Sequence, residues 1–213
     1  MLPDLSCGSV KASAKGLTMK LAPVGDKMEL RLKGPSITPG YFGAPEKTAE
    51  VFDDEGFYRM GDAVRPIDPD DLTKGFLFDG RIAENFKLST GTWVAVGVVR
   101  ADLVDAFSGL IRDAVIVGEN QGQLGALLLL SDAAKTMEPD ALQSALKSAL
   151  TKAAKSATGS SNRIQRALIL DTDPSFDRGE ITEKGSLNQR AMRANHAPQI
   201  DLLYAGVPSV LHA

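Results

Sequence analysis

The sequence is poor in residues that crosslink a chain or hold a metal ion. It contains one cysteine, Cys7, and two histidines, His196 and His212. A single thiol cannot form an internal disulfide, which is typical of proteins from a reducing compartment, and no histidine lies near Cys7 in sequence to activate it. Neither histidine has a cysteine or a carboxylate at the spacing of metal ligands. We therefore expect no chemical role for Cys7 and no metal site.

Long apolar runs and an excess of basic residues are also missing. The longest apolar run, residues 124–130, has the length of a buried strand and falls short of the roughly 20 residues that cross a membrane. Residues 1–20 lack the apolar core of a secretory signal. The formal net charge is -3 and Lys and Arg are scattered singly, so no basic face for nucleic acid is indicated. We expect a cytoplasmic protein with no membrane and no nucleic-acid partner.

Several common catalytic signatures are absent as well. The sequence has no GxSxG, HExxH or CxxC motif, and without a Walker-type glycine loop it has no phosphate cradle of its own. What is present is ordinary for a globular protein with a real core, since 43% of the residues are hydrophobic and 24% are charged. A length of 213 residues allows one large domain or two small ones.

The first 80 residues show short strand patterns joined by turns. Alternating apolar and polar side chains around Pro23-Val-Gly-Asp26 predict a hairpin, and 1–16 reads as loop. Strands are predicted at 17–22, 28–33, 57–60 and 76–78. They are too few and too short for a comfortable independent domain, so this half is typical of the end of a larger unit.

The rest of the chain mixes helical and strand patterns. Helices are predicted at 99–110, from Pro139 to the turn at 159–161, and from a capping box at 186–189 to Ala194. Strands are predicted at 114–117, 126–130 and 167–170. This order predicts a compact α+β domain from about 84 to 205. The joining stretch 75–94, GFLFDGRIAENFKLSTGTWV, is charged and glycine-flanked, so we expect a hinge and a site there.

Three charged turns could carry chemistry. Asp62, after Gly61, could accept hydrogen bonds from both hydroxyls of a vicinal diol such as a ribose. Arg81, beside Gly80 and followed by Lys87, suits planar contact with an oxygen-rich ligand. Lys184 lies in a glycine-flanked loop and could swing onto a phosphate or carboxylate. Taken singly, each more often has no chemical role, as a plain turn aspartate, a charged linker or a solvated surface lysine.

Four features in this order resemble the C-terminal portion of the adenylate-forming acyl-CoA synthetases. They are the motifs YRMGD and GFLFDGR, the lysine that follows, and the late glycine-flanked lysine. AENFKLSTGTWV and GEITEKGSLNQRA resemble most the feruloyl-CoA synthase branch. The opening GLTMKLAPVGDKMELRLKGPSITPGYF resembles the hairpin and GPxxTPGY turn that precede YRxGD in that family. The resemblance covers essentially the whole chain.

The resemblance implies roles for individual residues. Asp62 and Arg81 would hold the ribose hydroxyls of ATP and of the acyl-adenylate, and Lys184 would stabilise charge in the adenylation step. Lys87 would serve the thioester-forming step, with Gly91 leaving room for the pantetheine arm of CoA. The lid would rotate about Ala83 between the two steps, although many relatives carry Asp or Lys there. Many relatives also carry Pro-Lys-Thr-x-x-Gly-Lys near the late lysine, whereas Gly185 follows Lys184 here.

The resemblance also implies a domain plan and missing parts. Residues 1–80 would be a β-rich terminal subdomain of a truncated adenylation domain, 81–84 the hinge, and 85–213 an α+β lid. The phosphate-binding loop, the acyl pocket and the Thr-Glu pair that engages ATP and Mg²⁺ would lie upstream. We therefore expect the chain alone not to form acyl-adenylate at a useful rate. The surface left uncovered, near 17–60, would favour self-association.

Two alternatives to this enzyme role stay open. The chain could be a stand-alone nucleotide- or CoA-binding or regulatory module that pairs with a separate N-terminal chain. It could also be a structural α+β protein whose charged turns bind nothing. Because the acyl-pocket residues would lie upstream, feruloyl specificity is implied only by the likeness of the lid.

Overall fold

The structure is a computed structural model that describes residues 9–11, 16–25 and 27–213. It divides into two compact units, Met1–Ala83 and Glu84–Ala213, which are described one at a time. Cys7 lies outside the described residues. The mixed α and β content predicted from the sequence is confirmed.

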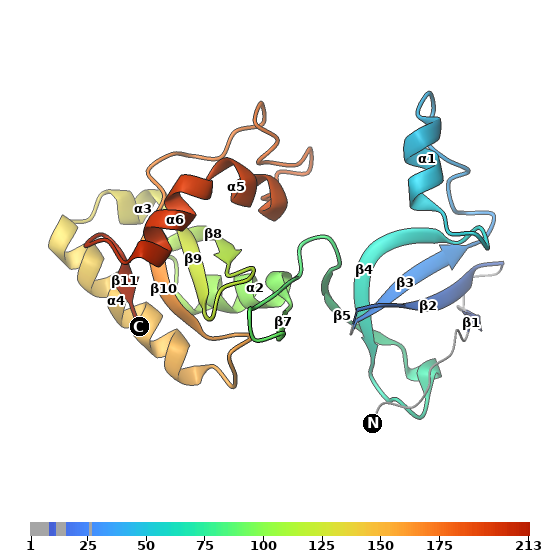
Figure 1. Cartoon of the computed structure of the whole chain (residues 1–213), viewed down its shortest axis with the longest axis horizontal. Helices are drawn as coiled ribbons and strands as arrows, with labels where there is room; N and C mark the ends of the chain where they lie inside the picture. The colour runs from blue at the N-terminus through green and yellow to red at the C-terminus, as the bar shows by residue number, and fades with distance from the viewer. Residues whose placement is uncertain (1–8, 12–15, 26) are drawn as a thin grey trace. The chain divides into compact units, whose positions relative to one another are not determined.

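The first unit is built on an antiparallel sheet whose strands lie side by side in chain order (Figure 1). The strands are β1 (Ser9–Lys11), β2 (Thr18–Val24), β3 (Lys27–Lys33), β4 (Tyr58–Pro66) and β5 (Phe76–Arg81). The predicted hairpin is present, with Leu21 opposite Leu30 across β2 and β3. Both later strands extend beyond the predicted ranges, so the YRMGD motif lies within β4 and GFLFDGR largely within β5.

Two elements of this unit differ from the sequence prediction. Residues 9–11, expected in a loop, form β1 and pair with β2 from Lys11↔Thr18 to Ser9↔Lys20. Because β1 forms only by pairing with β2, residues 9–11 show no strand pattern in their own sequence. The helix α1 (Pro45–Val51) lies between the predicted strands 28–33 and 57–60 and has no counterpart in the prediction. It buries no residue, so it has no apolar periodicity to detect. A short 3₁₀ turn, η1 (Leu72–Lys74), precedes β5.

The second unit starts with a two-stranded ribbon, β6 (Phe86–Lys87) and β7 (Trp93–Val94). A four-stranded sheet follows in the order β11-β10-β9-β8, in which β9 and β10 run parallel and the other neighbours are antiparallel. Its strands are β8 (Ile111–Val117), β9 (Leu124–Leu130), β10 (Ile164–Ile169) and β11 (Leu211–His212). The helices are α2 (Val96–Ala106), α3 (Asp132–Lys135), α4 (Pro139–Ser156), α5 (Gln189–Asn195) and α6 (Ala197–Ala205).

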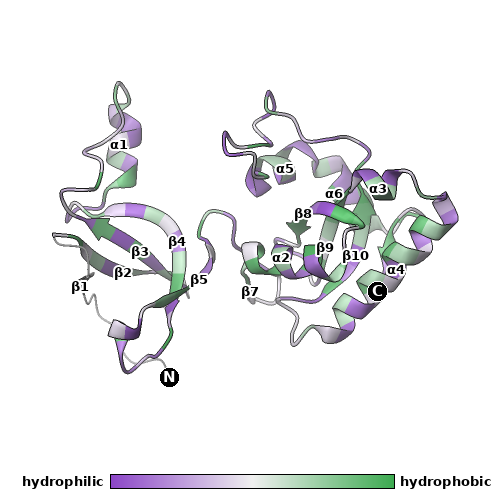
Figure 2. Ribbon diagram, turned by 180° about the vertical axis from the view of Figure 1, so that it is seen from behind, coloured by the Kyte–Doolittle hydropathy of each residue, from purple (hydrophilic) through white to green (hydrophobic). Residues whose placement is uncertain are grey.

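Helices cover both faces of this sheet (Figure 1), and the core divides accordingly. Ile116 and Leu128 face α2 and α4, where Leu103 and Leu146 are buried against them. The alternate strand residues, such as Leu127, pack against Met192 of α5 and Leu203 of α6. A sheet covered on both faces needs apolar side chains at successive positions, which explains the run LGALLLL in β9. Figure 2 shows apolar and polar residues side by side on α4, as expected for a helix that covers a sheet.

Three helix boundaries differ from the prediction. The helix predicted at 99–110 begins earlier and ends at Ala106, because Ser108 and Gly109 adopt positive φ angles of 48° and 87°. The predicted capping box at 186–189 is wrong: the cap of α5 is Asn188, whose side chain accepts from Ala191 N. Ser186 instead contacts Thr182 Oγ1 through its hydroxyl, at 2.7 Å. The chain then forms α6 and β11, which were not predicted.

Candidate functional site

The predicted nucleotide residues of the first unit, Asp62 and Arg81, face each other across β4 and β5. Arg81 Nε lies 3.0 Å from Asp62 Oδ1. This contact is an ion pair without hydrogen-bond geometry, and Oδ1 is buried with no donor among the described residues. The Asp62 side chain is 21% exposed and that of Arg81 56%, so a carboxylate acceptor and a guanidinium donor lie side by side at this turn, as a ligand with hydroxyl groups requires. The structure therefore places these two predicted residues together.

A bulge in β4 shapes the turn that carries Asp62. The pairing of β4 with β5 shifts between Asp62 and Val64, and Gly61 adopts a left-handed φ of 73°. Arg81 Nη1 donates to the carbonyl of Met60 at 3.2 Å, and Ile82 N donates to the carbonyl of Gly61 at 2.8 Å. Arg81 thus holds both the backbone and the side chain of this turn.

A network of buried charges lies behind the Asp62 turn. Glu29 accepts from Gly61 N at 3.2 Å and from Arg31 Nε at 2.8 Å. Arg31 Nη1 donates to Asp53 at 2.9 Å, and Lys20 Nζ donates to the same carboxylate oxygen at 3.2 Å. Burial alone would raise the pKa of Asp53, but hydrogen bonds from Phe57 N, Arg31 and Lys20 outweigh it and hold that pKa well below its usual range.

The second unit carries Lys87 and Gly91 on one small ribbon. Lys87 lies on β6 and is exposed, with its ammonium 5.0 Å from the centre of the Trp93 ring on β7. Gly91 forms the turn, where its N–H donates to the carbonyl of Leu88 at 2.9 Å and its φ is 81°. A side chain at Gly91 would meet no atom of the described residues within 4 Å. The turn is therefore open, as a ligand-facing glycine requires.

Arg193 of α5 fixes this ribbon to the body of the second unit. Its guanidinium stacks over the Phe86 ring at 5.4 Å, and Nη1 donates to the carbonyl of Glu84 at 3.2 Å. Burial lowers the pKa of Arg193, while the charges of Glu119 and Glu84 oppose that shift. The ribbon that carries Lys87 is thus tied to a helix more than 100 residues later.

Lys184 lies at the tip of a tied hairpin. The bridge Ile181↔Leu187 forms its stem, and the N–H of Gly185 donates to the carbonyl of Thr182 at 2.8 Å. The Lys184 side chain is exposed and makes no hydrogen bond or ion pair within the part of the chain that the structure describes. Its ammonium is free to meet an anionic ligand.

A buried glutamate, Glu180, forms the base of this hairpin. Its carboxylate accepts from Ser175 N at 2.9 Å, from Arg178 Nη2 at 2.9 Å and from Asn195 Nδ2 at 3.1 Å. His196 Nε2 lies 3.1 Å from Glu180 Oε1. Burial opposes ionisation, yet the hydrogen bonds from Arg178, Ser175 and Asn195 lower the pKa of Glu180 to about 2. The hairpin that presents Lys184 is therefore anchored by a charged side chain with 0% exposure.

The predicted site residues thus fall into separate groups. Asp62 and Arg81 belong to the first unit, Lys87 and Gly91 share one ribbon of the second, and Lys184 lies on another hairpin. Ala83 is the last residue of the first unit. Sequence reasoning missed the anchoring glutamates Glu29 and Glu180. The only local signal for either is an arginine two residues away, and that spacing is too common to be diagnostic.

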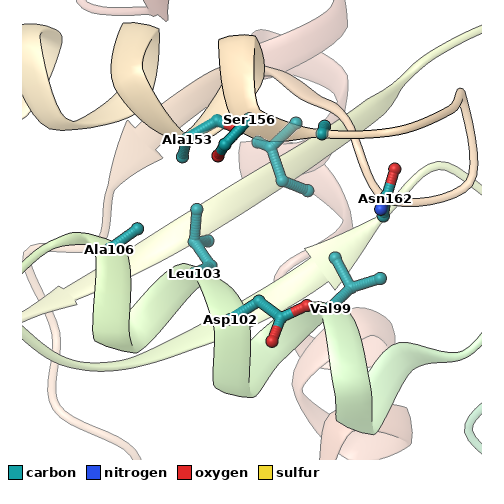
Figure 3. A pocket seen from close by; sticks show the side chains of 9 residues that line it. Val99, Asp102, Leu103, Ala106, Ala153, Ser156 and Asn162 are labelled. Carbon is teal, nitrogen blue, oxygen red and sulfur yellow. The ribbon is translucent and has the colours of Figure 1, made fainter.

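Two further features bear on ligands. A cavity of about 150 Å³ between α2 and α4 (Figure 3) contains none of the predicted site residues. Its lining residues are Val99, Asp102, Leu103, Ala106, Ala153, Ser156, Ala157, Asn162 and Ile164.

Within the described ranges, no three His, Cys, Asp or Glu side chains are grouped to hold a metal ion. None of the described helices is both long and apolar enough to cross a membrane.

Comparison with known proteins identifies the class. Residues 87–208 match the family described as AMP-binding enzyme C-terminal domain. The chain is 33% identical over 181 residues to a carboxylic acid reductase of Segniliparus rugosus, covering 83% of this chain and 15% of that protein. It is 28% identical over 220 residues to the long-chain-fatty-acid–CoA ligase FadD15 of Mycobacterium tuberculosis, covering 94% of this chain and 34% of that protein.

A solved structure agrees with these sequence matches. It is the A domain of the carboxylic acid reductase from Segniliparus rugosus, in complex with AMP and a co-purified carboxylic acid. The structural match covers 92% of this chain and 32% of the solved chain. The TM-score is 0.75 at 28% identity.

The chain belongs to the AMP-binding enzyme C-terminal domain family and is homologous to adenylate-forming enzymes. It spans from 15% to 34% of the length of the relatives named above. The predicted membership of the adenylate-forming class is confirmed, and the feruloyl-CoA synthase branch stays a prediction.

Proposed function

We propose that this chain is the C-terminal part of an ATP-dependent acyl- or aryl-CoA synthetase. The complete enzyme would convert a carboxylate, ATP and CoA into an acyl-CoA thioester, AMP and diphosphate through an acyl-adenylate. The observation that carries this proposal is the Asp62–Arg81 pair, in which a carboxylate and a guanidinium lie 3.0 Å apart with 21% and 56% of their side chains exposed. The ribose of ATP or AMP offers two hydroxyl donors, which a carboxylate such as Asp62 accepts.

Each of the other predicted residues has a place in this proposal. Lys184 would bring its unpaired ammonium to the negative charge that develops in adenylation. Lys87 and the open turn at Gly91 would face the thioester-forming step, where Gly91 admits the pantetheine arm of CoA. Ala83, at the boundary of the two units, would be the pivot between the steps. The groups that hold Mg²⁺, the triphosphate and the acyl moiety would come from an upstream adenylation domain.

Exposed apolar side chains on the first unit support a docking partner there. They are Tyr41, Phe42, Ile67, Leu77 and Phe78. Two of them lie within the range 17–60 in which an uncovered surface was expected, and three lie just beyond it. Without the upstream domain, these exposed side chains would favour self-association, which sedimentation velocity measures directly.

The reaction that follows activation of the acid has two candidates. The likeness of the AENFKLSTGTWV and GEITEKGSLNQRA segments supports a feruloyl-CoA synthase. The 33% identity to a carboxylic acid reductase supports instead an enzyme that reduces its activated acid. Fusing the chain to an adenylation domain and supplying ferulate, ATP and CoA separates the two, because the first releases a CoA thioester, whereas the second forms the acyl-adenylate without passing the acyl group to free CoA.

Calorimetry with AMP tests the nucleotide site directly. We expect the chain to bind AMP and Asp62→Ala to weaken binding at least tenfold, since the ribose hydroxyls lose their acceptor. Asp70→Asn is the matched control, an exposed carboxylate elsewhere in the first unit. If AMP fails to bind, or binds Asp62→Ala as tightly as wild type, the proposed nucleotide role is wrong.

Co-expression with an upstream adenylation domain tests the enzyme role against a regulatory one. We expect thioester formation to be restored and to be lost again in Lys184→Ala. Binding of AMP or CoA without any restored turnover would favour a stand-alone nucleotide- or CoA-binding module that regulates a separate chain.

A further inference from the structure

Glu29 lies opposite an irregular part of β4. Along β3, Glu29 pairs with Ala63 and Arg31 pairs with Arg59. The single residue Leu30 on β3 therefore faces the whole segment 60–62 of β4, which is bulged. A bulge removes residues from the strand ladder and leaves their backbone groups in need of other partners.

The Glu29 side chain supplies one of these missing partners. Its Oε1 accepts from the N–H of Gly61 at 3.2 Å. The carbonyls of the bulge are held from the other side, by Arg81 on Met60 and by Ile82 on Gly61. Gly61 adopts a left-handed φ of 73°. Because glycine populates positive and negative φ about equally, Gly61 alone does not fix the shape of the turn. Removing the Glu29 carboxylate would therefore take away the acceptor that fixes the Gly61 N–H.

Glu29 is itself held rigidly. Its side chain is only 7% exposed, and its second oxygen accepts from Arg31 Nε at 2.8 Å. Arg31 is in turn fixed by Asp53 at 2.9 Å. A carboxylate with both oxygens engaged and little contact with water keeps one position, which is what a template for a neighbouring turn requires.

We propose that Glu29 is a positioning residue for the nucleotide site. It does not touch the nucleotide. It holds the N–H of Gly61 and so fixes the turn from which Asp62 presents its carboxylate to the ribose. This inference rests on the proposed function, because it assumes that Asp62 binds the ribose hydroxyls.

Two substitutions at Glu29 separate positioning from stability. Glu29→Leu removes both acceptor oxygens. Glu29→Gln keeps an oxygen that can accept from Gly61 but turns an amide donor toward Arg31. Both remove the charge that compensates Arg31, so we expect both to lower the unfolding midpoint. Only Glu29→Leu should release the Gly61 amide.

Amide hydrogen exchange and AMP calorimetry on the same proteins give the answer. In Glu29→Leu, we expect the Gly61 amide to exchange at least tenfold faster and AMP to bind about tenfold more weakly. In Glu29→Gln, both values should stay within threefold of wild type. Asp53→Asn is the stability control, because it weakens the network behind Glu29 while leaving the Glu29–Gly61 hydrogen bond in place, and AMP binding should be unchanged.

The outcomes are distinguishable. Unchanged Gly61 exchange in Glu29→Leu overturns the inference, and so does faster exchange with unchanged AMP affinity in a protein whose Asp62→Ala variant binds poorly. Equal loss of AMP binding in Glu29→Gln, Glu29→Leu and Asp53→Asn would show a general loss of stability instead of positioning, and also overturns it. If wild type does not bind AMP, the proposed function fails and the ribose half of the inference falls with it, while Gly61 exchange still decides whether Glu29 holds the turn.

Discussion

Glu180 and Lys184 stand at opposite ends of one hairpin, four residues apart in sequence. The carboxylate of Glu180 is fully buried at the base, whereas the ammonium of Lys184 is exposed at the tip. Between them, Thr182 N donates to the carbonyl of Ser186 at 2.9 Å, and their hydroxyls lie 2.7 Å apart. The sequence suggests a loop on which a lysine swings freely, but in the structure the lysine lies on a short tip above a hydrogen-bonded base.

Removing the Glu180 charge should weaken the second unit in a pH-dependent way. The pKa of Glu180 is lowered to about 2 from an ordinary value of 4.5. Because the folded state holds the carboxylate ionised, its contribution to stability is fully present above pH 4.5 and is lost as the pH falls toward 2. We expect Glu180→Gln to lower the free energy of unfolding by about 3 kcal/mol at neutral pH. Urea titrations at several pH values would measure this.

The variant should also flatten the acid side of the stability curve. Glu183→Gln, at an exposed position of the same hairpin, is the matched control and should retain the wild-type curve. A Glu180→Gln protein whose stability falls as steeply as wild type below pH 4.5 would show that another group governs acid unfolding.

A side chain at Gly91 should strain the ribbon turn without any clash. The φ of 81° disfavours an L-residue, while the space around the missing Cβ is open. We expect Gly91→Ala to lower the free energy of unfolding of the second unit by about 1 kcal/mol. Gly159→Ala, also in open space but without a left-handed φ, should have no such cost.

A larger side chain at Gly91 tests the proposed path of the pantetheine arm. In an assembled enzyme, Gly91→Val should slow thioester formation more than adenylation. Equal slowing of both steps would argue against a pantetheine path at this turn.

Gln189 should be essential for the edge of the second sheet. Its buried side chain accepts from Ile116 N at 3.0 Å and donates to the carbonyl of Ala114 at 2.8 Å, so it takes the place of a further strand beside β8. Gln189→Leu leaves both buried backbone groups unpaired, and we expect a loss of about 2–4 kcal/mol. Gln143→Leu, at an exposed position of α4, is the control and should leave stability unchanged within error.

Gly125 marks the closest approach of β9 to α6. A Cβ there would lie 2.6 Å from Leu203 Cδ2 and 3.2 Å from Arg166 Cγ. Since Leu203 is fully buried, it cannot move away freely. We expect Gly125→Ala to cost about 1–3 kcal/mol in thermal or urea unfolding. At Gly122 the nearest atom is Ser89 Oγ at 4.0 Å, so Gly122→Ala should be tolerated, and equal effects of the two variants would contradict this packing argument.

Much of the architecture could be predicted from local patterns. The hairpin of β2 and β3 alternates apolar and polar residues around a glycine turn, and α4 shows apolar residues at helical spacing after Pro139. The apolar runs of β8 and β9 also predict strands covered on both faces. Elements without a buried face, such as α1, gave no pattern and were missed.

The order of the charged turns was equally informative about the class of enzyme. Asp62 after Gly61, Arg81 after Gly80 and the two later lysines suffice to predict an adenylate-forming relative, and the comparisons confirm that class. They do not identify the acid, because side chains that select it are not among the predicted site residues of this chain.

The sequence by itself therefore determined the mixed fold, the order of the main strands and helices, and the family. Only the tertiary structure decided what holds the turns in place. Glu29 meets Gly61 across 32 positions, and Gln189 meets Ile116 across 73. A hydrogen bond between residues so far apart depends on where folding brings their backbones, and it leaves no periodic trace in the sequence around either partner.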